Sequence, residues 1–264
     1  MQLKHLLLAA ALALTATHAR AQGFSDTLMG VRDGPWISNP GGEKGSRDVN
    51  KIIVNVGHFD VWNYGSNFFN VDILFSNANE PANNSAGGST EFYGVYHGQL
   101  SPDKIFGLNT KFGPFSAINF EFGGDAESEN TQFAPDKKLL VVGPNFNVAM
   151  PAGFLNIGVH VSKEWNNNGI CADGCTKVNA NGSLAGNPTN FHATPEFELV
   201  WLYPLAFTGL PLDFRGFANF VLPKGTDGFG NKTTYEILAR PQIQLDLGKM
   251  IGLPSHKPDI YLAV

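Results

Sequence analysis

The chain has 264 residues, with thirty Gly, sixteen Pro and twenty-one Phe against only four Met. Aromatic residues favour strands while Gly and Pro favour turns, so this composition argues against a mainly helical protein. Without Lys4 and Arg20, which precede residue 22, sixteen basic side chains face twenty-three acidic ones and the net charge is about −7. That acidic balance argues against a nucleic-acid partner.

Residues 1–21 have the order of a secretory signal peptide. Lys4 precedes the apolar run Leu6–Ala13, and the small-residue site Ala19–Ala21 follows it. The apolar run is too short for a membrane-spanning helix, and no later stretch of eighteen apolar residues offers one. We therefore expect residues 1–21 to be removed on export and residues 22–264 to form a single domain.

Both cysteines lie close together in a polar stretch. Cys171 and Cys175 fall within Asn166–Asn190. In an exported protein such a pair predicts a small loop disulfide, and two thiols alone make a poor metal site. We expect neither a metal nor a cofactor.

Segments of about ten residues alternate between apolar and polar side chains, and Phe154–Glu164 shows the pattern. Its odd positions are Leu155, Ile157, Val159 and Val161, and its even positions are Asn156, Gly158, His160, Ser162 and Glu164. Successive side chains of a strand point to opposite faces, so one face is aliphatic and the other small or polar. The pattern recurs in Ala117–Asp125, Ala193–Tyr203, Leu212–Leu222 and Thr233–Leu247.

The full pattern predicts eleven strands separated by turn-forming clusters. They are Phe24–Arg32, Val49–Phe59, Ser66–Ser76, Glu91–Leu100, Ser116–Asp125, Lys137–Val148, Gly153–Trp165, His192–Tyr203, Pro211–Leu222, Thr233–Leu247 and Pro258 onward. A soluble sandwich would also alternate, but the long strands, the signal peptide and the aromatic apolar face favour a transmembrane antiparallel β-barrel. Bacterial barrels close with an even number of strands, so we expect a twelfth strand beyond Val264.

Connection lengths predict which loops lie outside the cell. Met150–Ala152 and Pro204–Leu210 are short, as periplasmic turns are. The longer connections then all fall on the other side, at Asp33–Asp48, Asn77–Thr90, Ala126–Asp136, Asn166–Phe191 and Pro223–Lys232. Ser101–Pro114 is long for a periplasmic connection.

The inward phase of these strands predicts the lining of the interior. The candidate solute-contacting residues are Asp72, Tyr93, Glu121, Asn145, Glu196, Glu198, Arg215, Phe217, Arg240 and Gln242. Glu196 or Glu198 could form a ladder of opposite charges with Arg215 and Arg240 on the next two strands. Such charges either contact a solute or pair only to avoid being buried alone.

Two other functional classes have a basis in the same residues. His160, Ser162 and Glu164 could suggest a hydrolase, but side chains two apart on a strand are roughly 6 to 7 Å apart, too far for a catalytic triad. We therefore expect no enzyme. Long outer loops also allow a surface receptor or a structural barrel without selective transport.

Four segments resemble the Tsx family of nucleoside-specific channels, and its OmpK branch most. They are Asn67–Asp72, Val142–Asn145, Pro151–Asn156 and Pro223–Gly230, and the likeness runs in the same order along nearly the whole chain after residue 21. The resemblance implies a monomeric twelve-stranded barrel in the Gram-negative outer membrane, in contact with its lipid. It implies passive transport of nucleosides and, in some members, use as a bacteriophage receptor. None of the family's nucleoside-contacting residues is assigned to a position here.

Overall fold

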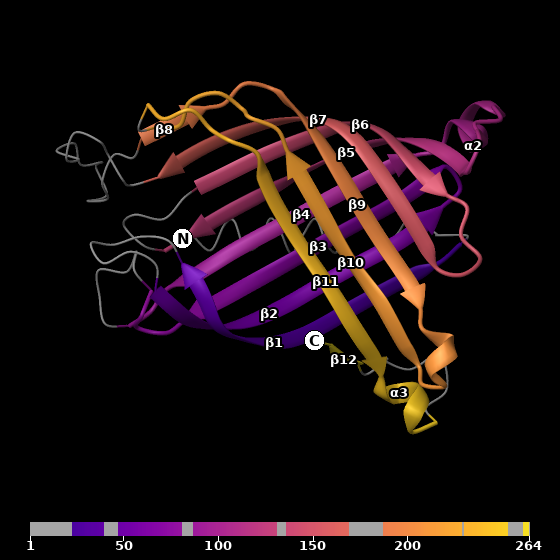
Figure 1. Cartoon of the computed structure of the whole chain (residues 1–264), viewed down its shortest axis with the longest axis horizontal. Helices are drawn as coiled ribbons and strands as arrows, with labels where there is room; N and C mark the ends of the chain where they lie inside the picture. The colour runs from indigo at the N-terminus through magenta and orange to yellow at the C-terminus, as the bar shows by residue number, and fades with distance from the viewer. Residues whose placement is uncertain are drawn as a thin grey trace.

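The computed structural model describes residues 23–39, 47–80, 87–130, 136–168, 187–228, 230–252 and 261–263. These residues form an all-β structure in which antiparallel strands curl into a half-barrel (Figure 1). The predicted signal peptide, Cys171 and Cys175 lie outside the described residues. No helix among the described residues is long and apolar enough to span a membrane.

The strands are long and the helices are single turns. The strands are β1 Ser25–Asn39, β2 Arg47–Trp62, β3 Gly65–Ser76, β4 Thr90–Leu100, β5 Phe115–Glu129, β6 Asp136–Val148, β7 Phe154–Asn168, β8 Asn187–Asn190, β9 Thr194–Pro204, β10 Leu212–Val221, β11 Glu236–Asp246 and β12 Tyr261–Ala263. The helical turns are α2 Pro102–Phe106, η2 Ala206–Thr208 and α3 Leu247–Met250.

The strands lie side by side in chain order, each antiparallel to its neighbour. The path runs from β1 to β7 and on through β9, β10, β11 and β12, with β8 paired to the end of β7. Among the described residues, no backbone pairing joins β1 to β12. Figure 1 shows β9, β10 and β11 facing the inner side of β2, β3 and β4 across the curl.

The helical turns gather at one end of the curled sheet and β8 lies at the other (Figure 1). The connections at the helical end include the short 149–153 and 205–211 and the long 101–114, which contains α2. Gly153 turns the chain before β7 with a φ of 68°. Glycine tolerates this left-handed conformation because it has no Cβ. β1, β3, β5, β7 and β10 end on the side that carries β8, so the connections predicted to lie outside share one side, while the long connection 101–114 lies on the other.

The faces of the sheet are inverted relative to a soluble protein. Large apolar side chains are exposed on the outside of almost every strand, among them Met29, Val31, Ile52, Phe68, Phe122, Leu140, Val161, Phe197, Phe220 and Ile243. Polar and charged side chains dominate the buried set, including Asn55, Asp72, Glu121, Asn145, His160, Glu164, Glu196, Glu198, Gln244 and Asp246. A soluble domain would bury the first set and expose the second.

All eleven predicted strands are present, but several have different bounds. β1 extends to Asn39 through an irregularity between Gly34 and Ile37, where Trp36 adopts a positive φ of 57°. β5 likewise continues to Glu129. β8 was not predicted, because its Asn-Pro-Thr-Asn sequence has turn composition; four backbone pairs with β7 hold it in the sheet.

Candidate functional site: the polar interior

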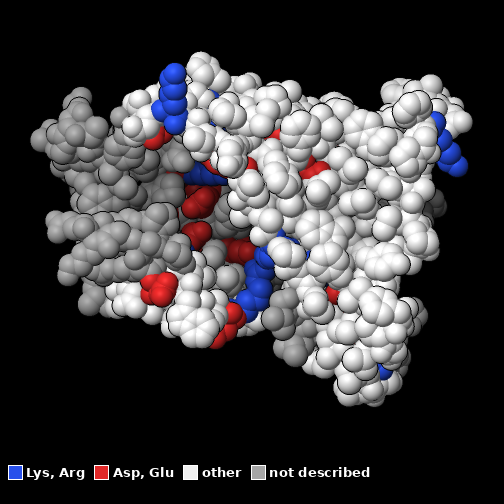
Figure 2. Space-filling model, in the orientation of Figure 1, with Lys and Arg blue, Asp and Glu red and all other residues white. Residues whose placement is uncertain are grey.

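The inner face of the sheet holds the polar chemistry of the molecule. Figure 2 shows a hollow lined by acidic and basic side chains, while the visible outer surface of the strands is largely uncharged. Three groups of side chains bring different strands together within this interior: a histidine cluster, a contact around Asp72, and a lysine network near the loop end.

The histidine cluster consists of His97 on β4, Glu121 on β5, His160 on β7 and Glu198 on β9. His97 Nδ1 lies 2.6 Å from Glu121 Oε1 and 3.8 Å from Glu198 Oε1. His160 Nε2 lies 3.8 Å from Glu121 Oε2. Since β4 and β9 are four steps apart in the sheet, the contact of His97 with Glu198 crosses the interior.

Neighbouring groups fix the carboxylate of Glu121. Asn145 Nδ2 donates to Glu121 Oε2 at 2.5 Å, and Gln99 Nε2 donates to the same oxygen at 3.0 Å. Asn119 Nδ2 in turn donates to Gln99 Oε1 at 3.0 Å. Hydrogen bonds from two amides hold the carboxylate in one orientation and keep its charge satisfied while it is buried.

Glycines make the space that the two imidazole rings occupy. A Cβ on Gly158 would lie 2.4 and 2.7 Å from atoms of the His160 ring, and one on Gly123 would lie 3.1 Å from His97 Cδ2. Gly158 pairs with Glu198 in the sheet register, and the His160 ring lies over Gly158, with Nε2 3.8 Å from Glu121 Oε2. No larger residue would leave room for the ring at Gly158.

Asp72 on β3 contacts β1, at one end of the described sheet, and β11, the strand next to the other end. It accepts from Arg32 Nη2 on β1 at 2.6 Å and from Asn55 Nδ2 on β2 at 2.5 Å, and it lies 3.8 Å from Arg240 Nη1 on β11. The Arg240 guanidinium also covers the Phe217 ring at 5.2 Å. Because β3 and β11 face each other across the curl, this contact narrows the interior.

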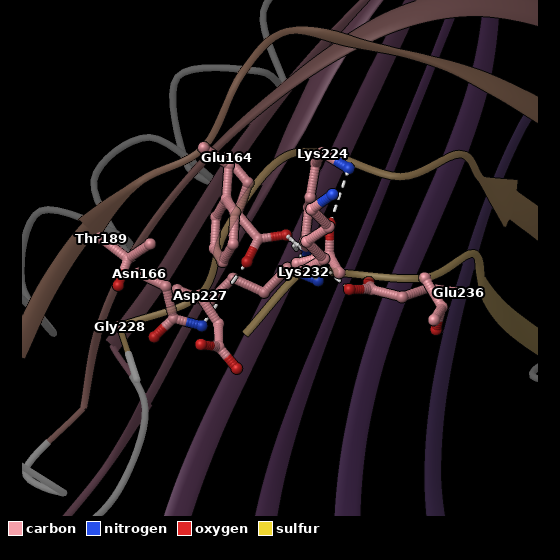
Figure 3. A pocket seen from close by; sticks show the side chains of 12 residues that line it. Glu164, Asn166, Thr189, Lys224, Asp227, Gly228, Lys232 and Glu236 are labelled. Atoms are coloured by element: carbon pink, nitrogen blue, oxygen red, sulfur yellow. Dashed lines mark hydrogen bonds and ion pairs between the residues drawn. The ribbon is translucent and has the colours of Figure 1, made fainter. Parts of the chain in front are cut away.

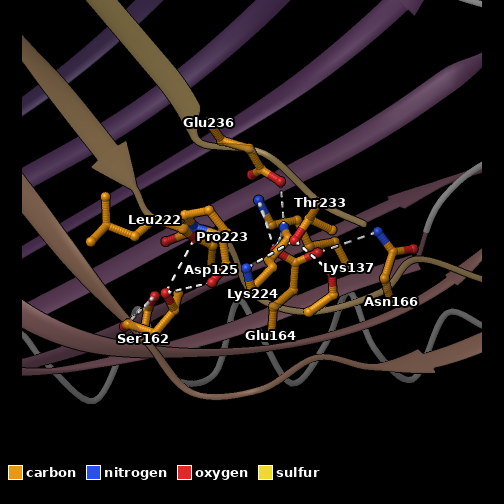
Figure 4. Close-up of polar contacts among 12 residues, drawn as sticks. Asp125, Lys137, Ser162, Glu164, Asn166, Leu222, Pro223, Lys224, Thr233 and Glu236 are labelled. Carbon is orange, nitrogen blue, oxygen red and sulfur yellow. Dashed lines mark hydrogen bonds and ion pairs between the residues drawn. The ribbon is translucent and has the colours of Figure 1, made fainter. Parts of the chain in front are cut away.

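The lysine network consists of Lys137, Glu164, Lys224 and Glu236. Lys224 Nζ lies 2.5 Å from Glu164 Oε2 and 2.6 Å from Glu236 Oε1, and Lys137 Nζ lies 3.8 Å from Glu164 Oε2. Figure 4 shows Lys224 reaching from the connection after β10 to the side chains of β7 and β11. The Lys224 ammonium also lies over the Phe191 ring at 4.5 Å.

A cavity of about 460 Å³ opens beside the lysine network (Figure 3). Glu164, Lys224 and Glu236 line it together with Lys232 and Asp227. Its walls are charged, and four of the lining residues, Lys137, Glu164, Lys224 and Glu236, form ion pairs with one another. The cavity is therefore polar and lies near the end of the sheet that carries β8.

The structure places most of the predicted lining residues in these contacts. Asp72 and Arg240 meet across the interior, and Glu121 contacts Asn145 directly. Tyr93 donates its hydroxyl proton to Asp125 Oδ2 at 2.7 Å. Whether any of these residues contacts a solute stays a prediction.

The expected ladder of opposite charges does not form. Arg215 pairs with Leu202 in the register, four residues from Glu198, which itself lies opposite Asn219. Four residues along a strand amount to roughly 13 Å, beyond ion-pair reach. Arg215 instead donates to Gln244 Oε1 at 3.0 Å. The alternation in the sequence predicts which face of the sheet a residue lies on, but which residues lie opposite it on the neighbouring strand depends on the register.

Several residues of these groups were not among the predicted lining residues, among them His97, Arg32 and Lys224. His97 shares the inward phase of Tyr93 on the same strand, so the alternation could have identified it. Arg32 lies at the end of the first predicted strand, and Lys224 in an expected outer loop. Nothing in the sequence indicates that the Lys224 side chain returns to the interior.

His160 and Ser162 are not hydrogen-bonded to each other. Neither ring nitrogen of His160 makes a hydrogen bond among the described residues, and Ser162 Oγ donates to the backbone oxygen of Thr194 at 3.4 Å.

No family model matches this chain, and no curated protein or solved structure matches it either. Functional interpretation therefore rests on the residues and contacts described above.

Proposed function

We propose that this protein is an outer-membrane β-barrel that passes small hydrophilic solutes, with nucleosides as the substrate class. The observation that carries the proposal is the inverted sheet: an apolar outer face and a polar, charged interior on the same strands. Apolar side chains are stable in the hydrocarbon core of a membrane, and a closed barrel is the only all-strand structure whose backbone hydrogen bonds are all made within that core. The leader-like residues 1–21 support export.

The interior contacts favour a narrow passage over a wide pore. Side chains from strands four and seven steps apart in the sheet meet within 4 Å, at His97 with Glu198 and at Asp72 with Arg240. A barrel of about twelve strands lies between filled eight-stranded barrels and open porins. Such a passage would suit small neutral solutes and exclude larger ones.

Nucleoside as the substrate rests on the resemblance and on the type of groups available. A nucleoside needs an aromatic face for its base and hydrogen-bonding groups for its sugar. Phe217 beside Arg240, and Tyr93 beside Asp125, provide both kinds of group on the inner face. These two pairs are the candidate contacts.

The second candidate is a surface receptor or structural barrel whose interior is closed. The observation in its favour is the same set of ion pairs across the interior, because paired charges can fill a barrel instead of lining a path. In that case the long loops would carry the function, as a bacteriophage receptor does.

Single-channel conductance in planar bilayers separates the two candidates. The channel proposal predicts small openings that adenosine or thymidine reduces with increasing concentration, while glucose and glycine at the same concentration do not. Steady openings indifferent to all four solutes would refute the nucleoside assignment but keep a general pore. An absence of openings in protein that shows folded-barrel mobility on gels would favour the receptor.

A further inference from the structure

The histidine cluster differs from the rest of the interior because its carboxylates have no Lys or Arg partner among the described residues. Glu121 and Glu198 are both buried, and the neighbouring Glu196 has a buried carboxylate oxygen without a hydrogen bond. Among the described residues, no Lys or Arg lies within 4.0 Å of these three carboxylates; their only partners of basic type are His97 and His160. Buried carboxylates without a full positive charge are costly, so such a group favours a cation.

His160 provides an observation independent of the acidic groups. Its side chain is fully buried, yet both ring nitrogens lack a hydrogen-bond partner in the described part of the chain. Its ring leans over Gly158 so that Nε2 points toward Glu121. A buried imidazole normally satisfies its nitrogens, so an unpartnered one directed at a carboxylate is a poised ligand.

The geometry of the other donors suits one ion. One ligand atom each from His97, Glu121 and Glu198 lie within 4.8 Å of one another. Tetrahedral Zn²⁺ with bonds of about 2.0 to 2.2 Å places its ligand atoms about 3.4 Å apart. The contact of His97 Nδ1 with Glu121 Oε1 at 2.6 Å would lengthen, and the contacts at 3.8 Å would shorten. His160 lies outside the group of three within 4.8 Å, so its ring would have to rotate inward to become the fourth ligand.

We infer that His97, Glu121, His160 and Glu198 form a binding site for a divalent transition-metal ion within the interior of the sheet. Two imidazoles and two carboxylates are a ligand set for Zn²⁺ and related ions, whereas Mg²⁺ and Ca²⁺ prefer oxygen alone. Asn145 and Gln99 would orient the Glu121 ligand through the hydrogen bonds that they already donate. The ion would link β4, β5, β7 and β9.

Metal binding at the histidine cluster does not depend on solute transport, and it can be measured directly without a transport assay. Purified, untagged protein in detergent would be dialysed against Zn²⁺, and bound metal would be measured by atomic emission. We expect one Zn²⁺ per chain, with Mg²⁺ in excess unable to displace it. His160→Ala and Glu198→Gln should each weaken binding at least about ten-fold.

His58→Ala is the matched control. His58 Nε2 lies 3.4 Å from Asp60 Oδ2, so the pair has one imidazole and one carboxylate but lies outside the cluster. This variant should bind Zn²⁺ as the parent protein does. Cobalt substitution gives a second readout, because tetrahedral Co²⁺ with nitrogen and oxygen ligands absorbs strongly in the visible range. The site would be overturned if the parent protein bound less than one Zn²⁺ per chain, or if His160→Ala, Glu198→Gln and His58→Ala all bound Zn²⁺ with equal affinity. If the cluster variants do not fold, the cobalt spectrum of the parent protein decides: a spectrum without tetrahedral absorption would overturn the site.

Discussion

The histidine cluster and the lysine network are both buried groups of charge in one interior, but they are built differently. In the lysine network two ammonium groups face two carboxylates, so each charge has an opposite partner. In the histidine cluster the carboxylates outnumber any fixed positive charge, and neither ring nitrogen of His160 has a hydrogen bond within the described part of the chain. The difference indicates that the lysine network holds the fold together while the histidine cluster is open to a ligand.

Removing Lys224 should produce the largest effect on stability. In Lys224→Met, the buried Glu164 carboxylate loses its contact at 2.5 Å and keeps Lys137 at 3.8 Å and a long hydrogen bond from Asn166 Nδ2 at 3.5 Å. Breaking one partner of a buried ion pair costs about 3–5 kcal/mol. The unfolding free energy in urea, followed in detergent micelles, should fall by that amount.

Lys138→Met is the control for this substitution. Lys138 forms an ion pair with Asp136 at 3.2 Å, but its side chain is 65 % exposed. A solvated pair of this kind contributes at most about 1 kcal/mol. Equal losses in the two variants would contradict the assignment of a structural role to the lysine network.

Gly158→Ala should affect the histidine cluster with a smaller loss of stability. The added methyl group would meet the His160 ring at 2.4 Å, so the ring must move away from Glu121. Overpacking of this kind costs about 1–3 kcal/mol. Zn²⁺ affinity should fall, while Gly30→Ala, where no atom lies within 4 Å, should leave it unchanged. Unchanged affinity in Gly158→Ala would show that the ring position does not matter.

Arg240→Ala tests the contact between opposite walls and should have the smallest effect on stability. Arg240 is 44 % exposed and 3.8 Å from Asp72, so its loss should cost less than about 1 kcal/mol. A shorter side chain at the narrow level should nevertheless raise single-channel conductance, on the order of two-fold. Ile237→Ala on the outer face of the same strand should not change it. Identical conductance in both variants would place the narrowest point elsewhere.

Much of the sheet could be predicted from the sequence, because period-two alternation reports on the face of each residue. Phe154–Glu164 alternates without a break, and its inward residues His160, Ser162 and Glu164 are all buried. The same pattern correctly placed Glu121 and Asn145 on the inner face. These positions follow from local geometry alone.

Contacts between distant strands could not be predicted, because they depend on register and on the curl of the sheet. The expected pairing of Glu198 with Arg215 does not form because the strand register places the two residues at different positions along β9 and β10. Glu198 contacts His97 only because the sheet curves between β4 and β9. Leu139–Val142 shows a second limit. All four residues are apolar, so the sequence does not distinguish inside from outside there.

The same four residues allow the most direct test of the central claim, that the outer face of the sheet contacts lipid. Leu139 and Val141 are 6 % and 3 % exposed, whereas Leu140 and Val142 are 59 % and 44 % exposed. Each would be changed to Cys in a background with Cys171→Ser and Cys175→Ser, spin-labelled, and reconstituted in lipid vesicles. The collision rate of the spin label with oxygen, which concentrates in hydrocarbon, should be highest at positions 140 and 142. The collision rate with a water-soluble nickel complex should be low at these two positions. High nickel access at positions 140 and 142 would mean that this face meets water, and would contradict the account.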